Sequence, residues 1–420
     1  MKRLFSLLVL AILTVSCDRV EISDQVEPDS IPPLTVGLTK AQEAVAAGQI
    51  KFDIEFFKKT AESAEGNMVV SPFSMAAAWS MASAGAAGDT YSEIAATLGF
   101  KDCTSSEIGA FYSKSLEAMQ PSSDNAKLSV ANAIWVDKRS VLKDGFVSDV
   151  ENSYSAEVAS LDLTDLKSID YINDWVKDKT GGMVEQLIDE SAKNAAMIMT
   201  NAVFFDAKWL ASFDVKDIEF TDIDGIKAER PFFYGSFTAA AKVYNLENGE
   251  NYDASEPQAI CLHYFKDSPL EMVFVLPPKD IAINDYIAGL NDSKWNSLMS
   301  SLSTPRMSTK LYIPEFKAAA SVEDPKSILS EMGIHKAFSN DPDFSKALDD
   351  PVGVSQIFHK ADIDVSHEGV RAAAASALVF DFTSTGAQVQ YQIFKADRPF
   401  VYAIIEPTTQ SILFMGVLRK

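Results

Sequence analysis

Apolar residues recur at helical spacing in the first part of the chain. Phe52, Phe56 and Phe57 lie on one face of a predicted helix, and an Ala- and Met-rich run follows Ser71 and Pro72 up to position 87. Proline is favoured in the first turn of a helix, where its missing N–H has no partner to lose. The pattern therefore predicts helices over the first hundred residues.

Later apolar runs are shorter and rich in β-branched and aromatic residues, which favours buried strands. We expect strands over 128–136, 196–205, 272–276, 400–405 and 412–418. No Pro-, Gly- or Ser-rich break divides the chain after about position 40, and no internal repeat is visible. Helices first and strands mostly later predict a single α+β domain over 39–420.

The N-terminus has the pattern of a bacterial lipoprotein signal. Lys2 and Arg3 precede an apolar run over 4–15, which is too short to span a bilayer, and Cys17 follows. Residues 1–17 are expected to be a lipoprotein signal with its lipidated cysteine. We expect cleavage before Cys17, lipidation of that cysteine and attachment to the bacterial envelope, at the outer membrane or cell surface. A plain cleaved signal and secretion is the alternative. Residues 18–38 hold five acids, one base and three prolines, a composition that predicts a flexible tether.

Charge and composition exclude several classes of function. The 420 residues carry 59 acidic and 37 basic side chains, a net charge of −22, which argues against a nucleic-acid surface. The three cysteines are too few for a disulfide scaffold, and no two of the four histidines are spaced i, i+4. We therefore expect no metal and no cofactor. Cys103 and Cys261 are expected to be isolated thiols, with a bridge between them as the alternative.

Catalytic motifs are missing from the sequence. There is no GxSxG elbow, no P-loop and no Rossmann glycine pattern. The acidic clusters at 18–29, 247–250 and 349–350 are best interpreted as solvated faces rather than paired catalytic acids. A Ser/His/Asp arrangement forms only in space, and nothing in the sequence places one.

One segment, residues 368–394, gives two conflicting signals. Its Ala-rich part has high helix propensity. Strand alternation over 370–383 instead puts Arg371 and Asp381 on one face, while the other face carries no charge. Residues 383–386 have the composition of an exposed loop tip. The same stretch therefore has features of both a loop and a strand.

The chain carries a series of short motifs. They are 67–74 (NMVVSPFS), 85–90 (GAAGDT), 129–133 (SVANA), 172–176 (INDWV) with Thr180, 201–205 (NAVFF) with Trp209 and Phe213, 358–361 (FHKA), Gly369 with its Ala run, 397–400 (DRPF) and 413–416 (LFMG). Together these motifs resemble the serpin family, from about residue 40 to 420 and in the family's order. The resemblance implies a large mixed or antiparallel central sheet, two smaller sheets, about nine helices and an exposed reactive-centre loop near 368–394.

For function, the resemblance implies a monomeric inhibitor that is not an enzyme and traps a target serine protease covalently. The loop is cleaved and inserts into the central sheet as a new strand. The implied hinge consists of Glu368, Gly369, Val370, Arg371, Ala372, Ala373, Ala374, Ala375 and Ser376. Ser71, Ser74, Asn201 and His359 are implied to form a hydrogen-bonded cluster beneath the opening strands, with Trp209 in the upper sheet.

Two hinge positions, and the residue just before the hinge, depart from the family's pattern. Val370 stands where Thr or Ser is usual, Arg371 where Glu is usual, and His367 where Glu is common. Val370 is uncharged and suits burial, while Arg371 falls on the outward face after insertion, where its charge stays hydrated. His367 introduces the prospect of a pH-dependent loop.

The family's usual loop length places the scissile bond at Thr383–Ser384, with Asp381, Phe382 and Thr385 as alternatives. No Lys or Arg occurs between Arg371 and Lys395, which argues against a trypsin-like target. Thr383 suits an elastase-like or subtilisin-like pocket, which we favour, and Phe382 suits a chymotrypsin-like one. A non-inhibitory serpin that binds or carries a ligand is the alternative function.

Overall fold

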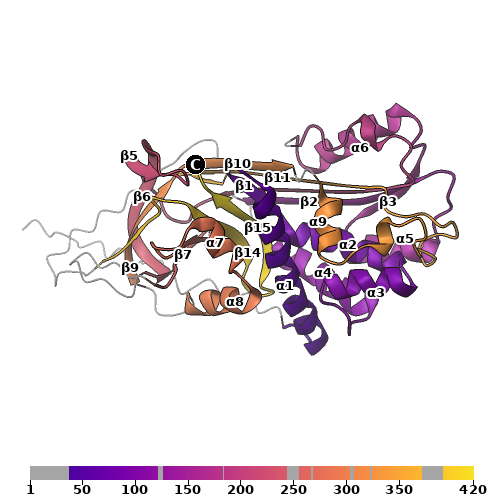
Figure 1. The fold of residues 1–420 in the computed structure, drawn as a ribbon, viewed down its shortest axis with the longest axis horizontal. Coiled ribbons are helices and arrows are strands. Elements are labelled where there is room, and N and C mark those ends of the chain that lie inside the picture. Colours follow the sequence, from indigo (N-terminus) through magenta and orange to yellow (C-terminus); the bar gives the residue numbers. More distant parts are fainter. Residues whose placement is uncertain are drawn as a thin grey trace, which may run out of the picture. The chain divides into compact units, whose positions relative to one another are not determined.

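The computed structural model describes residues 37–121, 126–182, 184–243, 255–265, 268–302, 307–321, 324–370 and 391–420, and these form nine α-helices and two hydrogen-bonded sets of strands (Figure 1). The chain from Leu34 to Lys420 is one compact unit. The signal and lipidation predictions fall on residues outside this description, as does most of the tether. No helix among the described residues is long and apolar enough to cross a membrane.

Several helices begin at a side-chain cap. Thr39 and Gln42 form a reciprocal capping box at the start of α1, as Thr104 and Glu107 do for α4. The helices are α1 (Lys40–Ser63), α2 (Pro72–Gly85), α3 (Gly88–Thr97), α4 (Ser105–Met119), α5 (Asp144–Tyr154), α6 (Leu166–Lys179), α7 (Ile283–Ala288), α8 (Asp292–Ser301) and α9 (Pro325–Glu331). Every residue of α2 except Ala84 is buried. Its small, Ala-rich side chains let neighbouring elements pack closely around the whole helix.

The main sheet has six strands, in the order β10, β11, β12, β4, β2, β3. Their bounds are β10 (Phe316–Ser321), β11 (Gln356–Ser366), β12 (Gly369–Val370), β4 (Met197–Lys208), β2 (Ala126–Asp137) and β3 (Glu157–Leu161). The two long strands β2 and β4 are antiparallel over eleven residue pairs, from Ala126 with Ala207 to Val136 with Met197. The strands predicted at 128–136 and 196–205 are confirmed.

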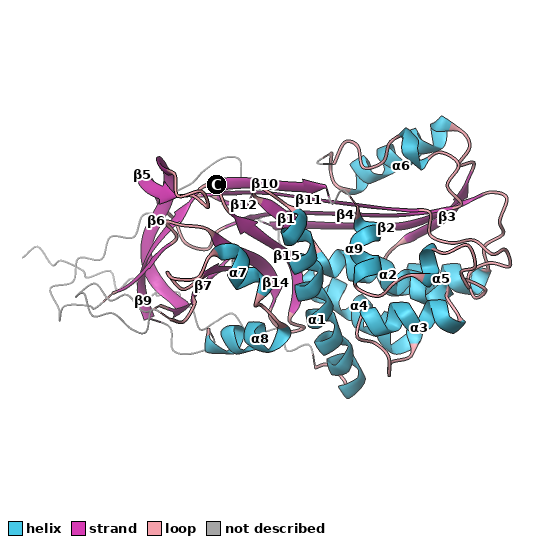
Figure 2. Ribbon diagram, viewed as in Figure 1, coloured by secondary structure: helices cyan, strands magenta, loops and turns pink. Residues whose placement is uncertain are grey.

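Helices cover both faces of the main sheet (Figure 2). Ile169, Ile172 and Val176 share one face of α6, and the first two pack with Ala133 and Trp135 of β2. The alternate residues of β2, Ile134 and Val136, point to the opposite face and join the large core that includes α1, α2 and α4.

The second set contains nine strands and bends at the long strand β6. Its order is β1, β15, β14, β8, β7, β6, β9, β13, with β5 paired beside β6. The bounds are β1 (Met68–Val70), β15 (Ser411–Leu418), β14 (Phe400–Glu406), β8 (Glu271–Leu276), β7 (Gln258–His263), β6 (Lys227–Lys242), β9 (Met307–Pro314), β13 (Gln392–Lys395) and β5 (Asp214–Thr221). Residues 227–239 of β6 pair with β5 and β9, whereas 240–242 pair with β7, so this set forms two sheets. The predicted α+β architecture with one large and two smaller sheets is confirmed.

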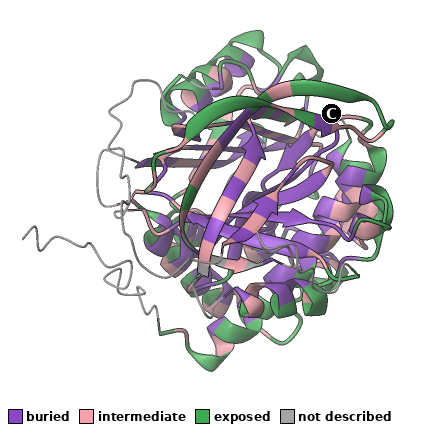
Figure 3. Ribbon diagram, turned by 90° about the vertical axis from the view of Figure 1, so that its left-hand side faces the viewer, coloured by how far each residue is buried: buried purple, intermediate pink, exposed green. Residues whose placement is uncertain are grey.

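Strand β15 lies in the interior of its sheet, between β1 and β14, and all eight of its residues are buried. In Figure 3 the buried residues gather in the central strands, while exposed residues lie on the surrounding helices and the outer strands. Arg419 follows β15 and is 2% exposed. Its guanidinium donates hydrogen bonds to the carbonyls of Ala61, Ala64 and Gly66, which fixes the end of α1 to the end of β15.

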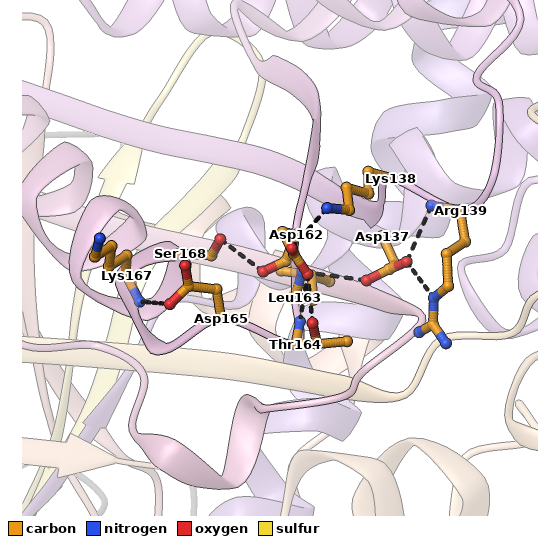
Figure 4. Close-up of polar contacts among 9 residues, drawn as sticks. All are labelled: Asp137, Lys138, Arg139, Asp162, Leu163, Thr164, Asp165, Lys167 and Ser168. Atoms are coloured by element: carbon orange, nitrogen blue, oxygen red, sulfur yellow. Dashed lines mark hydrogen bonds and ion pairs between the residues drawn. The ribbon is translucent and has the colours of Figure 1, made fainter.

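Polar contacts attach the start of α6 to the end of β2 (Figure 4). The buried Asp137 carboxylate accepts hydrogen bonds from the main-chain N–H of Leu163 and from Arg139. Burial raises the pKa of Asp137, but these hydrogen bonds outweigh it and hold the pKa below its usual value. Lys138 pairs with Asp162 at 2.7 Å. These contacts hold the loop before α6 against the main sheet.

Candidate functional site

The predicted hinge begins at one end of the seam between β11 and β4. The chain leaves β11, turns at residues 366–369 and enters β12, which pairs antiparallel with both neighbours. Val370 lies opposite Val365 of β11 on one side and Ala207 of β4 on the other. The first hinge residues therefore already form a short strand between the two long ones.

The turn requires glycine at position 369. Gly369 has φ of +147°, and a Cβ there would lie 2.1 Å from the carbonyl oxygen of Ala207 and 2.8 Å from the Cα of Lys208. Any other residue would clash with the main chain of β4, which has no room to move inside a paired sheet. The next residue, Val370, is 1% exposed and places its side chain in the core.

Trp209 holds this turn from the end of β4. Its indole N–H donates to the carbonyl of Ser366 at 2.8 Å, and its main-chain N–H donates to the carbonyl of Glu368 at 3.2 Å. The ring stacks on Tyr264, with centroids 4.8 Å apart and planes 7° from parallel. Trp209, which the resemblance to serpins places in the upper sheet, therefore contacts the hinge residue Glu368 directly.

Glu315 also binds the turn, and the sequence gives no sign of it. Glu315 lies between β9 and β10, and its Oε1 accepts a hydrogen bond from the main-chain N–H of His367 at 3.0 Å. The Nδ1 of His367 lies 2.6 Å from the same oxygen. A single carboxylate oxygen thus binds both the main chain and the ring of His367.

The other end of the seam is closed. Over Gln356–Lys360 of β11 and Ile198–Ala202 of β4 the two strands pair directly and in parallel. His359 lies opposite Asn201 in this register, with its Nδ1 3.2 Å from Asn201 Oδ1. Because the amide oxygen is an acceptor, Nδ1 carries the proton and donates it across the seam.

The four predicted cluster residues come together at this closed end. The main-chain N–H of Ser71 donates to His359 Nε2 at 3.1 Å, and Asn201 Nδ2 donates to the carbonyl of Ser74 at 3.1 Å. Within the described part of the chain the two serine hydroxyls have no partner, so both serines participate through their main chains. Asn132 of β2, which sequence reasoning missed, accepts a second hydrogen bond from Asn201 Nδ2.

His359 is 2% exposed, and this burial lowers its pKa to about 4. The imidazole is therefore neutral at pH 7, with Nε2 as acceptor and Nδ1 as donor. Its hydrogen-bond partners in the described structure are a main-chain amide and a side-chain amide, with no carboxylate to orient it as a general base. This is a structural histidine that connects α2 to the seam.

Comparison with known proteins decides the family. The model of the family described as serpin (serine protease inhibitor) matches residues 47–420. The chain is a serpin. Serpins are protease inhibitors and not enzymes.

Known relatives span nearly the whole of this serpin. Serpin A3-6 of Bos taurus is 30% identical over 99% of this chain and 97% of its own length, and Iripin-2 of Ixodes ricinus is 27% identical over 88% and 92%. Among solved structures, the thermophilic serpin tengpin in its native state superimposes with a TM-score of 0.78 at 26% identity, covering 89% of this chain and 94% of its own. Human thyroxine-binding globulin in complex with thyroxine superimposes with a TM-score of 0.77 at 26% identity, covering 90% of this chain and 99% of its own.

Several predicted site residues of this serpin lie outside the described residues. They are Cys17, the hinge positions Arg371, Ala372, Ala373, Ala374, Ala375 and Ser376, and the reactive-bond candidates Asp381, Phe382, Thr383, Ser384 and Thr385. Cys103 and Cys261 are both free thiols in the structure.

Proposed function

We propose that this serpin is an irreversible, suicide-type inhibitor of serine endopeptidases, and of cysteine endopeptidases by the same route. The protease nucleophile attacks the carbonyl of the scissile bond, the new amino terminus departs, and an acyl-enzyme forms. The freed part of the loop then inserts between β11 and β4 and carries the acylated protease with it. Fourteen inserted residues would move the protease by about 46 Å.

The position of β12 is the observation that carries this proposal. Gly369 and Val370 already pair with β11 on one side and β4 on the other, so insertion extends an existing strand rather than starting a new one. Extension of a paired strand avoids the cost of starting a new one, because each added residue gains main-chain hydrogen bonds on both sides. The side chain of Val370 is buried, so strand alternation would place the even-numbered residues after it on the core side of the inserted strand.

The residue types after Val370 are compatible with this alternation of core-facing and outward-facing positions. Even positions offer Ala372, Ala374 and Ser376, which are small enough to enter a closing sheet without displacing its neighbours. Arg371 falls on the outward face, where water solvates its guanidinium.

Insertion must separate the closed end of the seam. Five directly paired positions connect β11 to β4, and the His359–Asn201 contact crosses them. These two side chains also bind Ser71 and Ser74 at the start of α2, so α2 supports both strands from below. We infer that this cluster sets the resistance to opening.

The target follows from the loop sequence. The interval between Arg371 and Lys395 has no basic residue, so a protease with an acidic primary pocket has nothing to bind. We propose cleavage at Thr383–Ser384 by an elastase-like or subtilisin-like protease, with Phe382 and a chymotrypsin-like protease as the second choice.

A panel of such proteases tests this function. The expected product is a complex that survives denaturing electrophoresis, with intact mass placing the acyl bond at Thr383 or within two residues of it. Cleavage of the loop by every protease, with none trapped, would show that the inhibitor proposal is wrong.

The second candidate is a non-inhibitory binding or carrier serpin, favoured by the likeness to thyroxine-binding globulin, which is named for a small ligand. Thermal unfolding after limited cleavage of the loop separates the two. A serpin that inserts its loop gains main-chain pairing on both sides of a whole new strand and unfolds at a much higher temperature. A carrier that leaves its loop outside shows little change.

We also propose that Cys17 carries the lipid that anchors this serpin to the bacterial envelope. Growth with labelled palmitate should label the wild type and place it in the membrane fraction. The Cys17→Ser variant should lose both properties, and labelling that survives this substitution would contradict the proposal.

A further inference from the structure

Three side chains that commonly bind metals converge on one face of the hairpin formed by β7 and β8. His263 lies directly opposite Glu271 in the antiparallel register, and Cys261 lies two residues before His263. Alternate residues of a strand share a face, and so do directly opposed residues. All three side chains therefore project from the same side of the sheet.

The ligand atoms are close enough to share one ion. Cys261 Sγ lies 3.1 Å from Glu271 Oε2, and His263 Nδ1 lies 3.2 Å from Glu271 Oε1. All three ligand atoms lie within 4.8 Å of one another. Atoms bound to a common tetrahedral zinc at 2.0–2.3 Å are separated by about 3–4 Å, so small side-chain rotations would close the site.

The chemistry of the group also suits a cation. A cysteine sulfur, an imidazole nitrogen and a carboxylate oxygen all offer lone pairs to a metal. The Cys261 thiol donates a hydrogen bond to Glu271 in the structure, and a metal ion would displace that proton. Cys261 is 3% exposed, whereas the side chains of His263 and Glu271 are each 23% exposed. The site is thus buried on the sulfur side and reachable from solvent on the other.

The main chain holds these ligands in place before any ion arrives. His263 pairs with β8 on one side, and on the other its carbonyl accepts a hydrogen bond from the N–H of Leu210 at 3.0 Å. The next residue, Tyr264, forms a β-bridge with Trp209. A site on two fixed strands loses little conformational freedom when it binds metal.

We propose that Cys261, His263 and Glu271 form a zinc site. Zn²⁺ accepts sulfur, nitrogen and oxygen ligands together, and three protein ligands leave its fourth position for water. Bound zinc would fasten β7 to β8 next to the Trp209–Tyr264 stack, and would stabilise the folded chain because the unfolded chain has no preformed site. This proposal does not depend on protease inhibition.

Metal binding by the full chain is the direct test. After removal of metals with a chelator, the protein is loaded with Zn²⁺, freed of excess ion and assayed for bound zinc. Loading with Co²⁺ provides a second readout, because thiolate coordination gives a charge-transfer band. We expect one zinc per chain, a cobalt–thiolate band, and at least about tenfold weaker binding in Cys261→Ser and in Glu271→Gln. Cys103→Ser is the matched control and should bind as the wild type does.

Thiol protection tests the site in the wild type, without any substitution that could disturb folding. Zinc should slow alkylation of Cys261 but not of Cys103, as mapped by peptide mass. Absence of retained metal, equal binding by Cys261→Ser, or unchanged alkylation of Cys261 would each overturn the proposal, because the three groups would then be held together by shared protons alone.

Discussion

The two ends of the seam between β11 and β4 are built differently. At the closed end the strands pair directly, and His359 and Asn201 hold them to α2 through buried amide contacts. At the open end β12 lies between them, and the contacts that hold the turn come from the buried Trp209 and the partly exposed Glu315.

This difference separates two properties of the sheet. The closed end is dry and uses neutral hydrogen bonds, which are expensive to break because their partners would stay buried. At the open end, water can reach and replace the contact between Glu315 and His367. The sheet is therefore stabilised against opening at one end and prepared for strand extension at the other.

The largest effect is expected from a charge on the inward face of the hinge. Ala372→Arg would bury an unpaired guanidinium during insertion, at a cost of several kcal/mol. Val370→Arg would bury one already in the uncleaved protein, because Val370 is 1% exposed there. We expect the ratio of trapped to merely cleaved protease to fall by about a hundredfold or more. Quantitative electrophoresis of the products measures this ratio.

Ala373→Arg is the matched control, because strand alternation places position 373 on the outward face. It should retain inhibition. Equal loss in both variants would show that the face assignment is wrong.

The second effect concerns the closed end and depends on pH. The pKa of His359 is about 4 in the folded state and about 6.5 in an unfolded chain, so on acidification the unfolded state binds the proton first. Stability from this group is complete above pH 6.5 and is lost as the pH falls toward 4, by up to about 3 kcal/mol. Urea unfolding at several pH values should show this loss in the wild type.

His359→Gln should remove that part of the pH dependence, while His335→Gln, at an exposed position, should keep it. If the free energy of unfolding depends on pH in His359→Gln as it does in the wild type, the acid sensitivity comes from other groups.

A smaller effect is expected at the open end from Trp209→Phe. Phenylalanine keeps an aromatic ring against Tyr264 but lacks the N–H that binds Ser366. Loss of one such hydrogen bond is worth about 0.5–1.5 kcal/mol, so the amides of Gly369 and Val370 should exchange with solvent about two- to tenfold faster.

Trp175→Phe on α6 is its control, since it also removes an indole hydrogen bond, here to Glu157 on β3. Exchange at the hinge should be unchanged in that variant. Acceleration there would mean that the two regions open together.

The smallest effect is expected from Glu315→Gln. The contact with His367 is partly exposed, and such pairs contribute about 0.2–1 kcal/mol. Exchange of the His367 amide should rise by no more than about fivefold. Glu331→Gln, which removes an exposed partner of Lys59, should leave it unchanged, and an equal rise in both would rule out a local role for Glu315.

The sequence predicted those parts of the fold that depend on local pattern. The apolar runs at 272–276, 400–405 and 412–418 are strands β8, β14 and β15, because continuous apolar runs with turn residues at their ends suit sheets buried on both faces. Strand alternation also placed Val370 on the inward side of its segment, where the structure buries it.

The contacts that hold the seam could not be read from local pattern. Glu315 reaches His367 across 52 positions, and Asn132 reaches Asn201 across 69. Either residue, taken alone, looks like an ordinary surface polar residue.

The sequence-based expectation of no metal site was based on histidine pairs spaced i, i+4 and left out ligands spaced i, i+2 on a strand. Histidine pairs at i, i+4 share a helix face, but on a strand the residues that share a face are i and i+2. Cys261 and His263 have that spacing, and Glu271 joins them only through the hairpin register.

The position of β15 has a consequence for synthesis. Strand β1 pairs with β15, which follows it by about 340 residues. Strand β15 also pairs with β14 on its other edge. At about 5–20 residues per second, the ribosome needs roughly 20–70 s between making these two partners. Through that interval the apolar residues of β1 lack the strand with which they pair, so we expect the nascent chain to be most prone to aggregation before β15 is made.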